Sequence, residues 1–268
     1  MASTVTAATA TKQLLLRRDA DGVTTLTLNR PQQFNALSGA LLNELQAALA
    51  GIAGNQSVRV VVIAGAGPAF CPGHDLKEMR ANRNPGFIED LFRRCSRVMM
   101  TLTEIPQPVI ARVHGIATAA GCQLVAACDL AVASTEARFA TSGVNFGLFC
   151  STPGVALSRN MPRKQAMEML LTGEMISAAR ALEIGLINRA VPTEELDSAV
   201  ATLAGVIAGK SPKTLAIGKE AFYRQADMGL AEAYAYASEV MTQNMMARDA
   251  AEGIDAFIEK RHPTWQGR

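Results

Sequence analysis

Three buried, strand-like segments, each followed by a turn of small residues, constrain the fold of this chain most strongly. Segments with apolar residues at helical spacing lie between them, around 88–102 and 118–127. A strand that returns to its sheet through a helix runs parallel to the strand before it, so this order predicts a mostly parallel sheet with right-handed crossovers. The three strands are expected at 58–67, 108–115 and 129–134.

The N-terminal part of the sequence predicts a β-hairpin followed by a helix. Two alternating segments, 13–20 and 22–30, flank the pair Asp21-Gly22, which is typical of a two-residue hairpin turn. Ser38 precedes a run of apolar residues at helical spacing and is expected to cap that helix.

Beyond Pro153 the pattern is almost entirely helical up to about Lys260. We therefore expect three parts: a disordered tail at 1–12, an α/β core at 13–195 and a helical C-terminal region at 196–268. Helices that extend beyond a core often pack on neighbouring subunits, so the third part indicates an oligomer.

Charge and cysteine content exclude several classes of protein. The chain carries 26 basic and 24 acidic side chains, which gives no basic field for nucleic acid. No stretch of about 18 apolar residues is free of charge, so no membrane span is expected. The five cysteines are scattered without a CxxC pair, and residues 1–12 lack the features of a targeting signal. This pattern predicts reduced thiols, no metal site and a cytoplasmic protein.

The three turns of small residues are the candidate functional site. They span 67–79, 114–124 and 143–154, and in an open α/β sheet such turns meet at the carboxyl ends of the strands. Small residues there either permit tight packing of helix on sheet or expose backbone N–H groups to a ligand oxygen. None of the turns matches a nucleotide-phosphate motif.

Four segments together resemble one known family. They are NRPQQFNAL (29–37), FCPGHDLKEM (70–79), HGIATAAGCQLVAACDLAVAS (114–134) and EMLLTGEMISAARALEIGLINRAVP (168–192). In this order and spacing they are similar to the crotonase, or enoyl-CoA hydratase/isomerase, superfamily. The resemblance covers about residues 13–265 and implies an α/β spiral of ββα turns with a helical trimerisation region, assembled as a homotrimer or hexamer.

The resemblance also implies an acyl-CoA thioester as substrate and no metal or separate cofactor, since coenzyme A enters as part of the substrate. The thioester oxygen would lie between the backbone N–H groups of His74 and Ala120. The CoA chain would pass a set of residues from the first two motifs. That set is Phe34, Ala36, Pro72, Asp75, Leu76 and Lys77. Apart from the resemblance, the basic residue Lys260 either reaches the CoA phosphates of the same or a neighbouring subunit or forms part of a solvated helix end.

One departure from the family pattern bears on the reaction. Hydratases of the family use two glutamates, and the matching positions here hold Gln123 and Gly143. An amide cannot take a proton from water at neutral pH, and glycine has no side chain. The sequence therefore predicts a protein that binds acyl-CoA thioesters and has weak or absent hydratase activity. A non-catalytic acyl-CoA sensor or regulatory subunit is the alternative.

The third turn offers no acidic replacement for these glutamates. It carries Asn145, Cys150 and Ser151. Cys150 would act as a nucleophile if its thiol were activated, and otherwise it is a buried structural cysteine.

Overall fold

The computed structural model describes residues 13–268, and the expected tail at 1–12 lies outside the described residues. A six-stranded sheet forms the centre of the molecule, in the order β1-β2-β3-β5-β7-β10. β1 pairs antiparallel with β2 and the other neighbours pair parallel, which confirms the mostly parallel sheet. The strands are β1 Leu15–Ala20, β2 Val23–Leu28, β3 Val60–Gly65, β5 Val109–Val113, β7 Leu130–Ser134 and β10 Arg189–Val191.

The predicted hairpin joins β1 and β2. Asp21 and Gly22 both have positive φ, 50° and 76°, as a type I′ turn requires. The turn sets Ala20 opposite Val23.

A second, smaller sheet has the order β4-β6-β8-β9. It gathers the short strands that follow β3, β5 and β7, together with β9, so the chain winds through three successive ββα units, which begin at β3, β5 and β7. These strands are two or three residues long, too short to leave an alternating pattern in the sequence. They are β4 Ala69–Cys71, β6 Ile116–Thr118, β8 Arg138–Ala140 and β9 Ile176–Ser177.

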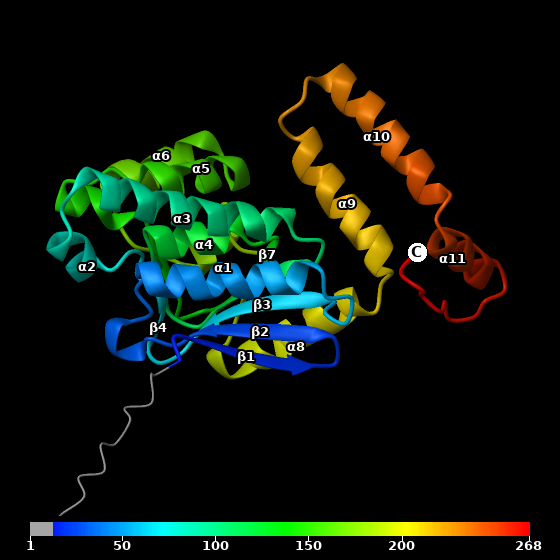
Figure 1. Ribbon diagram of the computed structural model, residues 1–268, viewed down its shortest axis with the longest axis horizontal. Helices are drawn as coiled ribbons and strands as arrows, with labels where there is room; N and C mark the ends of the chain where they lie inside the picture. The colour runs from blue at the N-terminus through cyan, green and yellow to red at the C-terminus, as the bar shows by residue number, and fades with distance from the viewer. Residues whose placement is uncertain (1–12) are drawn as a thin grey trace, which may run out of the picture.

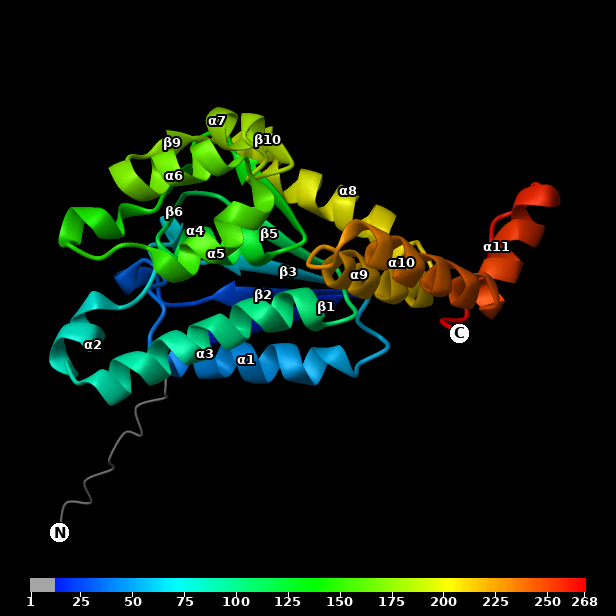
Figure 2. The ribbon, with the colours of Figure 1, turned by 90° about the horizontal axis from the view of Figure 1, so that it is seen from above.

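Helices cover both faces of the main sheet at its centre, so β3 is buried on both sides. Val61 and Ile63 of β3 pack in the large core with α1, α3 and α4, whereas Val60 and Val62 pack with α8. Figure 2 shows α1 and α3 on one side of the sheet and α8 on the other. The helices of this body are α1 Gly39–Ala53, α2 Leu76–Ala81, α3 Pro85–Glu104, α4 Ala120–Ala127, α5 Ser151–Asn160, α6 Arg163–Thr172, α7 Ala178–Glu183 and α8 Leu196–Ala208.

Short 3-10 helices complete this body, at Pro31–Gln33, Ser142–Phe146 and Thr193–Glu195. The predicted cap of α1 is confirmed, because the Ser38 side chain accepts a hydrogen bond from the Leu41 amide at 3.2 Å.

Two details of the C-terminal half add to the sequence prediction. The stretch after Pro153 is almost entirely helical, and its two short strands, β9 and β10, lie at edges of the two sheets. The expected boundary between 195 and 196 falls just before α8, and α8 packs on the sheet through Leu196, Val200 and Ala204.

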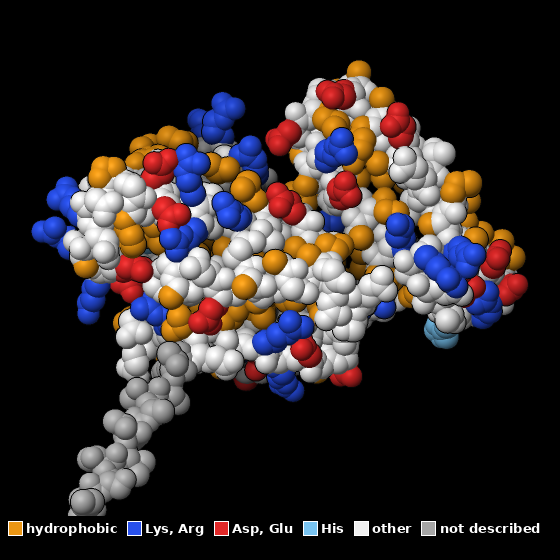
Figure 3. Space-filling view, viewed as in Figure 1, with side chains coloured by type: hydrophobic (Ala, Val, Ile, Leu, Met, Phe, Trp, Pro, Cys, Tyr) orange, Lys and Arg blue, Asp and Glu red, His pale blue; other side chains and the backbone are white. Residues whose placement is uncertain are grey.

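The helical arm therefore begins with α9. It consists of α9 Pro212–Gln225, α10 Leu230–Met245 and α11 Arg248–Ile258, which extend from one end of the body (Figure 1). Figure 3 shows apolar side chains at the surface of this arm, and exposed ones include Phe222, Leu230, Tyr234 and Met241.

A partly buried ion pair holds the arm to the body. Lys219 of α9 lies 2.7 Å from the carboxylate of Asp129 and donates to the carbonyls of Leu102 and Gln107. The Tyr223 hydroxyl donates to the same carboxylate at 2.8 Å, as does the Val109 amide at 2.7 Å. Asp129 thus has a structural role at the base of the arm.

Candidate active site

A cavity of about 660 Å³ lies where the three turns of small residues meet. Its wall is mostly apolar, and its residues come from the segments 32–36, 72–79, 118–120 and 142–153, together with Phe92 of α3. The sequence placed a site at these turns, and the cavity lies there.

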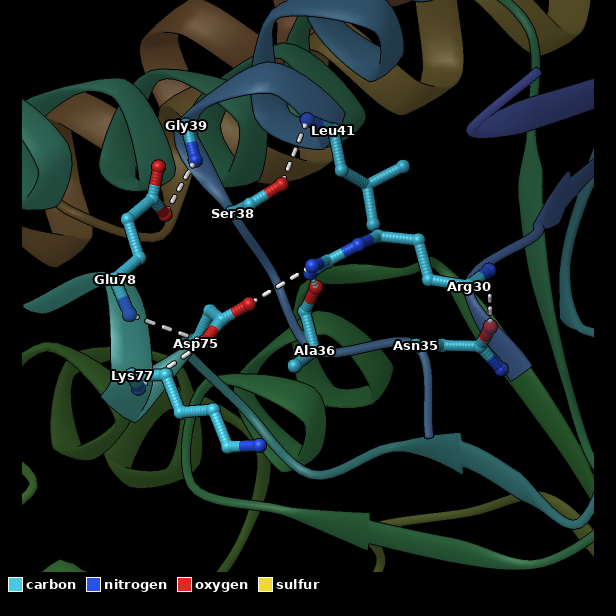
Figure 4. Close-up of polar contacts among 9 residues, drawn as sticks. All are labelled: Arg30, Asn35, Ala36, Ser38, Gly39, Leu41, Asp75, Lys77 and Glu78. Atoms are coloured by element: carbon cyan, nitrogen blue, oxygen red, sulfur yellow. Dashed lines mark hydrogen bonds and ion pairs between the residues drawn. The ribbon is translucent and has the colours of Figure 1, made fainter. Parts of the chain in front are cut away.

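The first turn is held by a network around Asn35 and Asp75, drawn in Figure 4. Asn35 is fully buried with φ of 66°, and its side-chain amide donates to the carbonyls of Ala66 and Ala69, both at 2.8 Å. Arg30 pairs with the Asp75 carboxylate at 2.8 Å and also donates to the Ala36 carbonyl. These contacts fix the segment 30–36 against the turn that carries His74.

Asp75 also begins α2. Its carboxylate accepts from the amides of Lys77 and Glu78 at 3.1 and 3.2 Å, which satisfies the free N–H groups of the first turn. Burial would raise the pKa of this carboxyl, but the hydrogen bonds from Arg30 and from the Glu78 amide outweigh burial and hold the pKa below its usual range. Glu78 accepts from the Gly39 amide at 3.0 Å and therefore caps α1 rather than facing the cavity (Figure 4).

The second turn brings the N-terminus of α4 against the first. A Cβ on Gly73 would lie 3.0 Å from the Ala119 Cβ and 3.1 Å from the Ala120 nitrogen, so the two turns are in close contact. Gly121 is required by the same approach, because a Cβ there would lie 1.9 Å from the Cys71 carbonyl oxygen.

Ala119 adopts an unusual backbone conformation at this junction, with φ of 48° and ψ of −119°. Such a conformation costs about 1–3 kcal/mol in a residue other than glycine. Two backbone hydrogen bonds hold this conformation. The Ala119 N–H donates to the Ala140 carbonyl at 2.9 Å, and the Ala119 carbonyl accepts from the backbone N–H of Gln123 at 3.0 Å.

The backbone N–H groups of His74 and Ala120 remain without a partner at this junction. Neither amide donates a hydrogen bond to another residue in the described part of the chain. Ala120 is the first residue of α4, so the positive end of the helix dipole adds to the potential at its N–H. Both residues line the cavity.

The third turn occupies the space beside Gly143. A Cβ on this glycine would lie 2.3 Å from the Leu148 carbonyl oxygen and 2.7 Å from the Cys150 sulfur. The Leu148 amide donates to the Gly143 carbonyl at 2.9 Å, which closes the loop over this position. The local backbone therefore leaves no room for a side chain at residue 143.

Cys150 lines the cavity and is buried. Burial raises the pKa of its thiol, although the backbone of Gly143 lowers it slightly. The thiol is therefore protonated at neutral pH, which gives no support to a nucleophilic role. All five cysteines are free and buried.

Gln123 lies in α4 and is buried, with 4% of its surface exposed. Its side-chain oxygen has no hydrogen-bond partner among residues 13–268, and it does not form part of the cavity wall. The structure thus places Gln123 behind the wall rather than on it.

The residues expected to hold coenzyme A lie along the cavity, with one exception. Phe34 and Leu76 are half-exposed at 54% and 51%, and the other members of that set also line the wall. Lys260 follows α11 at the far end of the helical arm (Figure 1) and does not reach the cavity of its own chain.

Sequence reasoning missed several residues of the site. Arg30 is hidden from any pattern, because its contact with Asp75 spans 45 residues. The apolar wall residues Met79, Phe92, Phe146, Leu148 and Phe149 were not singled out. The position of the last three in the third turn was the only signal for them.

Charged groups are scarce around the cavity. Of the described residues that line it, only Asp75 carries a carboxylate, and Arg30 and the start of α2 engage that carboxylate. Within residues 13–268 no cluster of three or more histidine, cysteine or acidic side chains could hold a metal ion. No described helix has the length and apolar character needed to cross a bilayer.

Comparison with known proteins identifies the family. Residues 18–268 match the family described as enoyl-CoA hydratase/isomerase. The mitochondrial enoyl-CoA hydratase domain-containing protein 3 of Rattus norvegicus is 47% identical over 253 residues, which cover 94% of this chain and 84% of the rat protein. This likeness confirms the resemblance carried by the four sequence motifs.

Two solved structures share the fold. The enoyl-CoA hydratase of Mycobacterium smegmatis is 56% identical, with a TM-score of 0.93 over 95% of this chain and 99% of that one. Human enoyl-CoA hydratase domain-containing protein 3 is 47% identical, with a TM-score of 0.92 over 94% of this chain and 100% of the human one. The crotonase-like ββα spiral with a helical C-terminal region is therefore confirmed.

The expected cytoplasmic location is corrected by the same comparison. The rat, mouse, human and frog relatives are all named as mitochondrial proteins, which points away from the cytoplasm. Reduced thiols had suggested the cytosol, but they exclude only oxidising compartments. With fold, cavity and relatives in agreement, the chain belongs to the enoyl-CoA hydratase/isomerase family, the crotonases.

Proposed function

We propose that the cavity binds an acyl-CoA thioester, with the thioester carbonyl oxygen between the N–H groups of His74 and Ala120. The two turns that carry these amides are in contact, and neither amide has a partner among the described residues. Unpartnered amides beside a helix N-terminus favour an oxygen on which negative charge develops. This pair of free amides is the observation that carries the proposal.

The shape and polarity of the cavity support an acyl group with a CoA tail. The wall is mostly apolar and includes Phe92, Phe146 and Phe149, which suit a hydrocarbon segment. The tail would pass Phe34, Ala36, Pro72, Asp75, Leu76 and Lys77, and coenzyme A would enter as part of the substrate rather than as a separate cofactor.

Hydration of an enoyl-CoA would be slow at this site. A positioned acid or base contributes about 10²–10⁴-fold to a rate, and Gln123 and Gly143 stand where the family has two glutamates. The one carboxylate on the described cavity wall, Asp75, is engaged by Arg30. Water beside a bound enoyl group would thus lack a base.

Stabilisation of an oxyanion would remain. Each donor of an oxyanion hole contributes about 10²–10³-fold, enough to assist reactions that pass through a thioester enolate or a tetrahedral intermediate. Isomerisation, slow hydration and thioester hydrolysis are the candidate reactions.

A non-catalytic acyl-CoA sensor is the second candidate. It is favoured by the third turn, whose Leu148 carbonyl and Cys150 sulfur lie where a side chain of residue 143 would begin. A protein kept only for binding would retain the cradle and lose the groups that move protons.

The helical arm supports assembly as a homotrimer or hexamer. α10 has no buried residue within one chain, and Phe222, Tyr234 and Met241 are 65%, 69% and 66% exposed. Apolar side chains exposed together commonly mark an interface between subunits. Size-exclusion chromatography with light scattering would give the oligomeric state.

Binding and turnover of a panel of acyl-CoAs test the proposed function. Calorimetry should give saturable binding of thioesters, and S-butyl-CoA, which lacks the carbonyl oxygen, should bind more weakly than butyryl-CoA. Equal affinity for the two compounds would show that the two amides do not bind the thioester oxygen. Turnover of any panel member would favour the enzyme over the sensor.

A further inference from the structure

The two ends of the cavity differ in charge. The only Lys, Arg, Asp or Glu side chains on the described cavity wall are Asp75 and Lys77, and both belong to the first turn. The third turn, residues 143–154, carries no charged side chain. Because charged groups are unfavourable on an apolar surface, a ligand with a polar and an apolar end has one preferred orientation here, with its apolar end at the third turn.

The third turn carries three large apolar side chains that remain exposed. Phe146, Leu148 and Phe149 are 66%, 50% and 49% exposed, and all three line the cavity. We call these three residues the apolar rim. Apolar surface in contact with water is unfavourable, and covering it with an apolar group is favourable. The apolar rim is therefore suited to a hydrocarbon segment of a ligand.

Hydrogen bonds hold the apolar rim in place. The Leu148 N–H donates to the Gly143 carbonyl at 2.9 Å. The side-chain amide of Asn145 donates to the carbonyl of Gly173, the residue that follows α6, at 3.4 Å. A surface that is already ordered loses little conformational freedom when a ligand binds to it.

The proposed position of the thioester leaves the third turn to the acyl chain. In the proposed complex the thioester oxygen lies between the N–H groups of His74 and Ala120, where the first and second turns meet. The CoA tail passes the first turn. The third turn is the part of the cavity wall that remains, so the acyl chain would extend from the thioester toward the apolar rim.

We infer that the apolar rim determines the acyl chain length that the site accepts, and that the site prefers long-chain over short-chain acyl-CoAs. The inference rests on the proposed acyl-CoA binding. Complete burial of one methylene group increases affinity about fourfold. The rim is roughly half-exposed, so a chain on it stays partly in water, and we expect about twofold per methylene.

A series of saturated thioesters from butyryl-CoA to dodecanoyl-CoA tests the preference. Calorimetry below the critical micelle concentration gives the dissociation constant of each compound. The ends of the series differ by eight methylene groups, so the wild-type protein should bind dodecanoyl-CoA on the order of 10²-fold more tightly than butyryl-CoA.

Serine variants of the apolar rim locate the effect. Phe146→Ser, Leu148→Ser and Phe149→Ser should each lower the ratio of these two affinities about fivefold, an equal share of the total, and the triple variant should bring the ratio close to one. The ratio compares two ligands on the same variant, so a loss of affinity common to both cancels. Should the triple variant fail to fold, the three single variants carry the test.

Leu171→Ser is the matched control. Leu171 lies in α6, is 62% exposed and is not part of the described cavity wall. This variant removes the same exposed apolar side chain as Leu148→Ser does, but away from the cavity. It should keep the wild-type ratio of affinities.

The inference is overturned if the wild-type protein binds butyryl-CoA and dodecanoyl-CoA equally tightly, or if the rim variants keep the wild-type ratio. It is also overturned if Leu171→Ser lowers the ratio as much as Leu148→Ser. An altered oligomeric state of the rim variants with an unchanged ratio would assign the rim to a subunit interface instead. Failure of the proposed function gives a different result, because short and long thioesters alike would then show no saturable binding.

Discussion

Substitution of Gly143 tests whether the third turn leaves room for a side chain at the position where hydratases of the family carry a catalytic glutamate. The residue at this position is a glutamate in hydratases of the family, so Gly143→Glu is the obvious attempt to restore activity. In this structure the first side-chain atom would already lie 2.3 Å from the Leu148 carbonyl oxygen and 2.7 Å from the Cys150 sulfur. We expect the loop to be displaced and the new carboxylate to miss the acyl group.

The size of the effect follows from these contacts. Both distances are far inside van der Waals contact, and one of the two atoms belongs to the backbone. Overpacking of a filled site costs about 1–3 kcal/mol, so Gly143→Ala should destabilise the protein by that amount. Each kcal/mol shifts the melting temperature of a chain of roughly this size by about 2–4 °C.

Thermal unfolding and a crotonyl-CoA hydration assay provide the measurements. Gly51→Ala is the matched control, because Gly51 is exposed in α1 and a Cβ there would meet nothing within 4 Å. The control should gain about 0.5–1 kcal/mol, as expected for glycine to alanine in a helix. The pair Gln123→Glu with Gly143→Glu should remain a poor hydratase.

The reasoning would be refuted if Gly143→Ala were as stable as the wild-type protein. It would also be refuted if the double glutamate variant hydrated crotonyl-CoA rapidly without any change in the loop.

Three further predictions concern single side chains. Burial lowers the folded-state pKa of His74 from 6.5 to about 4. As the pH falls from 6.5 to 4, the unfolded chain therefore binds a proton before the folded protein does, and the wild-type protein loses stability. His74→Leu has no imidazole to protonate, so its free energy of unfolding should fall by roughly 3 kcal/mol less over this range. Urea unfolding across this range checks the difference, with the exposed His262→Leu as a control that should follow the wild type. Lys219→Met leaves the largely covered Asp129 carboxylate without its cation and should cost about 3–5 kcal/mol. Adding Asp129→Asn should recover part of the loss in the same urea assay, and a loss in the double variant equal to the sum of the two single losses would contradict this coupling. Asp75→Ala removes the cap of α2 and should cost about 1 kcal/mol and weaken acyl-CoA binding by calorimetry, whereas unchanged affinity would show that the turn holds its shape without this carboxylate.

The long elements of the fold could be predicted from the sequence, and the short ones could not. The strand at 58–67 and the helix capped by Ser38 carry patterns several residues long, and both form. β4, β6 and β8 are three residues each, and they are strands because the ββα winding brings them together, which is a tertiary effect. α8 was assigned to the C-terminal region because a helix pattern does not reveal which surface the helix will cover.

The site was predictable where it depends on backbone and less so where it depends on contacts between distant segments. The turns at His74 and Ala120 were found from their small residues and from the family resemblance. The ion pair of Arg30 with Asp75 joins residues 45 apart and left no local signal. The lack of room beside Gly143 became visible only with the packing of Leu148 and Cys150.

One measurement on the purified wild-type protein tests the central claim most directly: binding and hydration of crotonyl-CoA, followed in the same preparation. The account predicts saturable binding, with hydration at least about 10²-fold slower than in a family hydratase that carries both glutamates. Rapid, saturable hydration of crotonyl-CoA would contradict it.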